Sequence, residues 1–299
     1  MSQPAVPRRQ MTPLEPVVRQ IESSAPLDGV AQNVAQLVRR VVPAGPVKDA
    51  LSGTWLGHAL HPMLTDLVIG SLMSASLLDL LAPGDDTAGD RLIMVGVAAY
   101  APTAMSGLSD WTDSEMGDDR VRRVGLVHAS GNALALGLYI ASLVARRGGR
   151  RGRGRLLSAA GATVLMGGGY LGGHMSFSRG IGPDQTVFDP GSTDWSPAAD
   201  SAQLQESKPT RVVVDETPIL LLKEGEEIFA IHDRCSHRGC SLSHGSVEGE
   251  EIVCGCHGSR FDRRTGAVTG GPATAPQPAF QVRRRDTIVE VRRLDPGSD

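Results

Sequence analysis

Two short cysteine–histidine runs constrain this chain more than any other feature of its sequence. The first is Cys235-Ser-His237, and the second, after the intervening residues 238–253, is Cys254-Gly-Cys-His257. Together they offer two thiolates and two imidazoles from two separate loops. That donor set suits a [2Fe–2S] cluster in which two Cys hold one iron and two His hold the other. It also suits a tetrahedral zinc ion.

The order of the donors favours iron over zinc, because a cysteine precedes a histidine in each run, unlike in a zinc finger. The surrounding segments, Cys235-Ser-His-Arg-Gly-Cys240 and Cys254-Gly-Cys-His-Gly-Ser-Arg-Phe-Asp262, resemble the two cluster-binding loops of Rieske proteins. Gly270-Gly-Pro272-Ala resembles the proline loop that covers the cluster in that family. The resemblance spans about residues 205–297. It implies one [2Fe–2S] cluster per chain, one-electron transfer, and four ligands: Cys235, His237, Cys254 and His257.

The same resemblance assigns roles to the neighbouring residues. Cys240 and Cys256 match the positions that form a loop-to-loop disulfide in cytochrome bc complexes; two free buried thiols are the alternative. Ser259 matches a serine that donates a hydrogen bond to the cluster, and such bonds raise the redox potential. Phe261 stands where high-potential members carry tyrosine, and Arg238 stands where quinol-oxidising members carry leucine. We therefore expect a potential between those of oxygenase-type and bc-type centres.

Four apolar segments precede this region, at about Ala59–Leu81, Leu92–Leu108, Val124–Val144 and Leu156–Phe177. Each is near the length that a helix needs to cross a bilayer. A soluble helical bundle is the alternative, but its helices should each show a charged face. The last two segments show none, so the sequence predicts a four-helix transmembrane bundle in contact with membrane lipid.

Four histidines fall at one end of these segments. His58 and His61 open the first segment, His128 lies near the start of the third, and His174 lies near the end of the fourth. Ionisable groups inside a membrane are costly and indicate a function by default. The alternatives are ligation of a b-type haem, binding of a quinone headgroup, and hydrogen bonds that hold the bundle together.

The segment Gly57-His-Ala-Leu-His-Pro-Met-Leu-Thr-Asp66 begins a second resemblance, which continues in Gly107-Leu-Ser-Asp-Trp111, Val124-Gly-Leu-Val-His128 and Tyr170-Leu-Gly-Gly-His174. These motifs, over about residues 50–180, resemble a family of uncharacterised bacterial four-helix membrane proteins. The resemblance implies a fold but no activity. An even number of spans would put the iron–sulfur domain on the same face as the N-terminus. Basic residues flank both ends of the bundle, so they do not decide on which side of the membrane the iron–sulfur domain lies. The lack of an export signal for a folded protein favours a cytoplasmic cluster.

The sequence therefore predicts a multidomain chain, an all-α transmembrane bundle joined to an all-β Rieske domain. Residues 1–50 are expected to be a mostly disordered tail with a short amphipathic helix at 29–42, where Val30, Val34, Leu37 and Val41 share a face. The bundle takes residues 51–178, a Gly/Pro/Ser/Asp-rich linker 179–206, and the cluster domain 207–297. Strands are expected at 211–214, 219–223, 227–231, 251–253, 280–284 and 287–292. His232 and His244 are expected on the surface.

Three functions compete. The first is a membrane-anchored carrier that passes one electron from a membrane-side donor to a redox partner protein, or as a ferredoxin feeds an oxygenase or reductase in trans. A complete Rieske oxygenase needs a second iron held by two His and a carboxylate, but no His follows His257. A redox sensor is the third, although no output domain is recognisable. The net charge of −3 gives no case for nucleic-acid binding.

Overall fold

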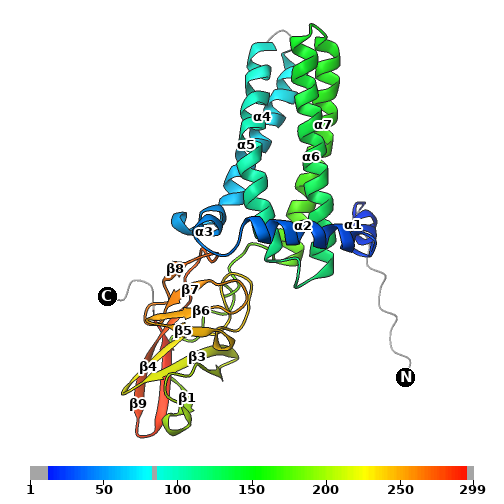
Figure 1. Cartoon of the computed structure of the whole chain (residues 1–299). Coiled ribbons are helices and arrows are strands. Elements are labelled where there is room, and N and C mark those ends of the chain that lie inside the picture. Colours follow the sequence, from blue (N-terminus) through cyan, green and yellow to red (C-terminus); the bar gives the residue numbers. More distant parts are fainter. Residues whose placement is uncertain (1–12, 83–85, 295–299) are drawn as a thin grey trace, which may run out of the picture.

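The computed structural model describes residues 13–82 and 86–294. They form a helical half, residues 13–178, and a β domain, residues 196–294, which lies beyond one end of the helical bundle (Figure 1). The four long helices are α4 (Leu60–Leu81), α5 (Asp86–Thr112), α6 (Asp119–Arg147) and α7 (Arg151–Gly173). A π-helical turn, His174–Ser178, continues α7. The structure therefore confirms the predicted all-α bundle and all-β domain.

The bundle is built from two helix hairpins, α4–α5 and α6–α7. Small residues bring the helices of each hairpin close together. Gly96 of α5 leaves room for Leu72 of α4, and Gly161 of α7 leaves room for Tyr139 of α6, whose ring lies 3.0 Å from where a Cβ would be. Close packing at small residues is the usual way in which helices associate inside a membrane.

Three of these helices are long and apolar enough to cross a membrane: Leu60–Leu81, Thr87–Thr112 and Asp119–Arg147. They coincide with three of the four predicted segments. The fourth helix, α7, is not among the candidates found in the described residues. Its sequence carries a run of glycines, Gly167–Gly169, which lower its hydropathy without preventing it from packing as the fourth helix.

The N-terminal region is more ordered than the sequence suggested. It contains α1 (Glu15–Glu22), α2 (Leu27–Val41) and α3 (Pro46–Ser52), and α2 crosses the end of the bundle (Figure 1). Arg123 of α6 holds Asp28 of α2 through two hydrogen bonds of 2.9 and 2.6 Å. Long-range contacts of this kind leave no trace in a local sequence pattern. The part of the expected tail at 1–12 lies outside the described residues.

The amphipathic helix α2 packs through the face beside the predicted apolar stripe, and Val34 is the one residue of the stripe that packs against the bundle. Ala31 and Ala35 are fully buried and belong to one cluster with Trp111 of α5. Leu37 and Val41 of the stripe are 61% and 70% exposed. The small alanines allow α2 to lie close against the bundle, while Val30, Leu37 and Val41 face outward.

The β domain consists of two antiparallel sheets. The six-stranded sheet has the order β1-β10-β9-β4-β3-β2, and the four-stranded sheet has the order β5-β6-β7-β8. The strands are β1 (Ser196–Asp200), β2 (Thr210–Val214), β3 (Thr217–Glu224), β4 (Glu227–His232), β5 (Ser246–Glu248), β6 (Glu251–Val253), β7 (Arg260–Asp262), β8 (Val268–Gly270), β9 (Ala279–Arg285) and β10 (Ile288–Arg293). All six predicted strands are present.

Two expectations for this region differ from the structure. The predicted linker 179–206 contains β1, which pairs with β10 at the sheet edge; the pairing partner lies about ninety residues further on and cannot be read locally. His232 is fully buried rather than on the surface. Its Nδ1 accepts a 3.0 Å hydrogen bond from Arg234 N, and its Nε2 lies 3.7 Å from Asp189. His244 is exposed, as expected.

Candidate iron–sulfur centre

Two matching turns carry the predicted ligands. The first follows β4, where Gly239 N donates a 2.8 Å hydrogen bond to Cys235 O. The second joins β6 to β7, where Gly258 N donates a 3.0 Å hydrogen bond to Cys254 O. Both glycines have positive φ, 77° and 81°, a conformation that glycine adopts without steric cost. Each turn therefore places a cysteine and a histidine on one short, rigid loop.

The structure brings the two predicted sulfur ligands together. Cys235 and Cys254 are free and buried, and their thiols are hydrogen-bonded to each other. That bond lowers the pKa of Cys254 to about 6. The same bond, together with burial, raises the pKa of Cys235. Backbone N–H groups also face each sulfur, those of residues 237 and 238 at Cys235 and of 256 and 257 at Cys254. The two buried sulfurs therefore lie side by side with backbone donors around them, an arrangement that suits two cysteine ligands of one metal site.

The two predicted histidine ligands are also neighbours. The rings of His237 and His257 lie edge to face, with centroids 5.2 Å apart. Among the described residues, Nδ1 of His237 is buried without any hydrogen-bond partner. An unpaired buried nitrogen costs free energy unless something binds it. Two thiols and two imidazoles with such an orphaned nitrogen fit a [2Fe–2S] cluster.

Cys240 and Cys256 form a disulfide that links the two loops, as the resemblance implied. Three cysteine sulfurs, those of Cys240, Cys254 and Cys256, lie close enough to hold an ion, the one such group of three or more in the described part of the chain. Two of these sulfurs are bonded to each other, so they are not thiolate donors. The donors left for a metal are therefore Cys235 and Cys254 with the two histidines.

The loop that follows β8 covers the site. Ala273 N donates a 3.1 Å hydrogen bond to Oγ of the fully buried Ser259. This leaves the hydroxyl proton of Ser259 free to donate, the role that the resemblance implied. Ser236 Oγ donates a 2.7 Å bond to Ala275 O and fixes the same loop. Phe261 is fully buried beneath the site and brings no hydroxyl.

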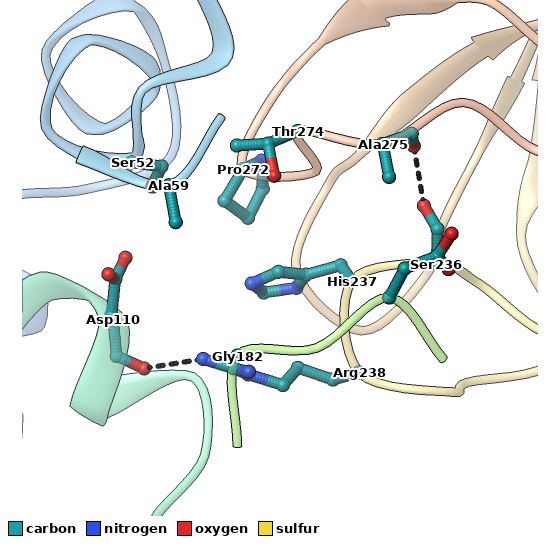
Figure 2. Close-up of a pocket in the computed structure, with 11 residues that line it drawn as sticks. Ser52, Ala59, Asp110, Gly182, Ser236, His237, Arg238, Pro272, Thr274 and Ala275 are labelled. Atoms are coloured by element: carbon teal, nitrogen blue, oxygen red, sulfur yellow. Dashed lines mark hydrogen bonds between the residues drawn. The ribbon is translucent and has the colours of Figure 1, made fainter. Parts of the chain in front are cut away.

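The site lies at the junction between the β domain and the helical half. Thr54 Oγ1 donates a 3.2 Å hydrogen bond to Ala273 O, and Arg238 Nη2 lies 3.5 Å from Asp110 O. Figure 2 shows the His237 ring between Arg238, the Pro272 loop and the helical residues Ser52 and Asp110, which surround a cavity of about 50 Å³. A polar cavity of that size accommodates water.

His237 meets the helical half most directly. Its Nε2 lies 3.6 Å from Oδ2 of Asp113, which follows α5, and Asp113 is paired with Lys48 of α3. Burial is the main cause that holds the pKa of His237 well below its usual range, and nearby cations act in the same direction. The sequence did not point to Asp113, because a single carboxylate after an apolar helix has no distinguishing pattern.

The predicted membrane histidines are distributed over separate contacts. His61 Nδ1 of α4 lies 3.0 Å from Thr103 O of α5, and His128 Nδ1 of α6 lies 2.8 Å from Gly168 O of α7. His174 pairs with Glu22 of α1 at 2.8 Å, whereas His58 is exposed. Each of the first three joins two helices. These contacts favour the alternative in which the histidines hold the bundle together through hydrogen bonds, and they lend no support to haem or quinone binding.

Comparison with known proteins agrees with both resemblances. Residues 194–281 match the Rieske [2Fe-2S] domain, and residues 57–185 match a family described as a predicted membrane protein (DUF2231). The anthranilate 1,2-dioxygenase ferredoxin subunit of Burkholderia cepacia is 37% identical over 98 residues, which cover 33% of this chain and 91% of that subunit. The chain belongs to the Rieske [2Fe–2S] family. Its Rieske domain is fused to a DUF2231 domain.

Other relatives of the Rieske domain are also ferredoxins. Ferredoxin CarAc of Metapseudomonas resinovorans is 33% identical over 78 residues, 26% of this chain and 73% of that protein. A solved structure, the ferredoxin of carbazole 1,9a-dioxygenase from Nocardioides aromaticivorans IC177, is 35% identical and covers 32% of this chain and 97% of that chain, with a TM-score of 0.31. The sequence relatives show that the Rieske domain is homologous to the ferredoxin components of dioxygenases.

Proposed function

We propose that this protein is a membrane-anchored Rieske electron carrier, which accepts one electron from a membrane-side donor and passes it to a partner protein. The proposed ligands are Cys235, His237, Cys254 and His257, with Ser259 as a hydrogen-bond donor. The observation that carries the proposal is the meeting of two free thiols and two imidazoles on paired loops joined by a disulfide. A bound [2Fe–2S] cluster cycles between its oxidised and one-electron-reduced states.

The residues of the chain support this role by excluding water and fixing the donors. The two thiols and the serine are buried, and the Pro272 loop lies over the ligand turns. His237 is covered by the helical half, whereas Gly255 and Cys256, beside His257, are exposed. We therefore infer that a redox partner approaches from the exposed turn at 255–257.

The likeness to dioxygenase ferredoxin subunits favours an oxygenase or another oxidoreductase as the acceptor in trans. A chain that supplies electrons is one component of such a system rather than a complete enzyme. The three apolar helices and the exposed stripe on α2 support a multi-pass membrane anchor. The N-terminal helices and the Rieske domain lie at the same end of the bundle (Figure 1), which supports their lying on the same face of the membrane.

The deciding experiment is a reduced-minus-oxidised optical spectrum of the detergent-purified protein, with a paramagnetic resonance spectrum of the reduced form. The broad bleaching of a Rieske centre supports the proposal. A zinc-loaded protein, with zinc measured by elemental analysis and no bleaching, would refute it. Sharp bands from a b-type haem in the same spectrum would show that the membrane histidines bind a cofactor after all.

A redox titration of the same sample tests the finer expectation. The His ligands and the donors around the sulfurs raise the potential above that of all-cysteine clusters, and the missing tyrosine hydroxyl at Phe261 lowers it relative to bc-type centres. We expect a midpoint between the oxygenase and bc classes. A value near the roughly −400 mV of plant-type ferredoxins would contradict this expectation.

A further inference from the structure

One edge of the His237 ring is enclosed by a charged group of the helical half. Nε2 lies 3.6 Å from Asp113 Oδ2, and the two side chains are only 9% and 4% exposed. The two residues belong to different domains and lie far apart in the sequence. The contact therefore joins a proposed cluster ligand of the β domain to a buried carboxylate of the helical half.

One atom of this imidazole and one atom of the carboxylate beside it lack hydrogen-bond partners. In the described part of the chain, neither His237 Nδ1 nor Asp113 Oδ2 has a hydrogen-bond partner. When Nδ1 is taken up by a metal, the remaining proton of a neutral ring must sit on Nε2. Nε2 is the nitrogen that faces Asp113. In this tautomer the ring proton faces the Asp113 carboxylate, and the 3.6 Å separation makes the contact an electrostatic one rather than a hydrogen bond.

The carboxylate is held in place by its own network. Asp113 Oδ1 accepts a hydrogen bond from Lys48 of α3, which is 6% exposed. Two residues further on, Glu115 accepts bonds of 2.8 Å from Arg39 and 2.6 Å from Arg122. These contacts fix residues 113–115 against α2, α3 and α6. Buried charges are screened by salt much less than surface charges. The electrostatic effect of Asp113 on the His237 ring should therefore depend little on ionic strength.

We propose that Asp113 is a positioning residue for the cluster ligand His237, and that its negative charge lowers the midpoint potential of the centre. This inference rests on the proposed function. A carboxylate beside the free nitrogen of a metal-bound imidazole makes the ligand more basic. A more basic ligand stabilises the oxidised form. Arg238, a half-buried cation beside this ring (Figure 2), acts in the opposite direction.

The opposite signs of the two charges give a sharp test in the full-length, cluster-loaded protein. Asp113→Asn removes the anion and should raise the midpoint potential. Arg238→Gln removes the cation and should lower it. Glu115→Gln disturbs the same segment without removing a charge that faces His237, so it should shift the potential much less than Asp113→Asn does. All four proteins are titrated at low and at high salt, and the shifts should persist at high salt.

The outcomes separate a charge effect from loosening of the domain junction. If Asp113→Asn and Arg238→Gln shift the potential in the same direction, or Glu115→Gln shifts it as much as Asp113→Asn, the junction rather than the charge is responsible and the proposal fails. An unchanged potential in Asp113→Asn also overturns it. If that variant loads no cluster, an unchanged potential in Arg238→Gln overturns it instead. A wild-type protein without a Rieske spectrum would refute the proposed function itself.

Discussion

Cys240 and Cys256 join the two ligand-bearing turns through a disulfide that closes a sequence separation of 16 residues. Cys256 immediately precedes the proposed ligand His257, and Cys240 ends the turn that carries Cys235 and His237. It therefore connects β4 and the β6–β7 turn at the place where the site needs both loops held together.

Removing this disulfide should destabilise the Rieske domain and make the cluster labile. A crosslink over a loop of about this size stabilises a fold by about 3 kcal/mol, mainly by restricting the unfolded chain. We expect the double variant Cys240→Ser/Cys256→Ser to lose its cluster absorbance at a lower temperature than the wild type. Wild-type protein treated with a reductant strong enough to open the bond is the control. Equal thermal stability of all three samples would contradict the prediction.

The four proposed ligands should be individually necessary for the spectrum. Cys254→Ser and His237→Asn each remove one donor and should abolish the Rieske bleaching and the resonance signal. His244→Asn changes an exposed histidine outside the two turns, and it should retain both. Iron content per chain provides an independent readout. A normal spectrum in Cys254→Ser would show that the ligand assignment is wrong.

A hydroxyl at position 261 should raise the redox potential. Phe261 is fully buried in β7 next to the second ligand turn, and hydrogen bonds to the cluster raise its potential. Phe261→Tyr should therefore have a higher midpoint than the wild type. Phe229→Tyr adds the same hydroxyl to the same core near the other end of β4, beneath Arg263 and Arg264. The prediction fails if both variants, or neither, shift the potential.

Close packing between α6 and α7 should depend on one glycine and not on its neighbour. A Cβ at Gly168 would lie 2.2 Å from Asn132 Oδ1, whereas a Cβ at Gly169 would meet nothing within 4 Å. Overpacking of this kind costs roughly 1–3 kcal/mol. Gly168→Ala should lower the thermal stability of the detergent-solubilised protein, and Gly169→Ala should leave it unchanged or raise it. Equal effects would argue against the helix contact.

The buried His232 should make stability depend on pH. Burial lowers the pKa of His232 although the Asp189 carboxylate opposes this. The unfolded chain, with a histidine pKa of about 6.5, then binds a proton before the folded one. Stability is therefore complete above that pH and falls as the pH decreases towards the folded-state pKa. His232→Gln should flatten the decline in melting temperature between neutral and mildly acidic pH, and His244→Gln should not. An equally steep decline in His232→Gln would contradict the assignment.

Both domain types, and the meeting of the four candidate ligand residues, could be predicted from the sequence because their signals are local. In each turn the cysteine and histidine are two or three residues apart. The residue four positions after the cysteine has a positive φ, a conformation that favours glycine. The apolar runs of α4, α5 and α6 reflect helix length and composition, and the strands of the Rieske domain carry their own β-forming residues. Neighbours along the chain determine each of these features.

The sequence could not show which parts of the two domains would meet. Asp113 and His237 are more than a hundred residues apart, and neither Lys48 nor Asp113 belongs to a recognisable pattern. The burial of His232, the pairing of β1 with β10 and the separate contacts of His61 and His128 have the same origin. A lone polar residue acquires its partner only when distant elements pack together, because burial removes water and leaves the nearest charge or carbonyl as the remaining partner.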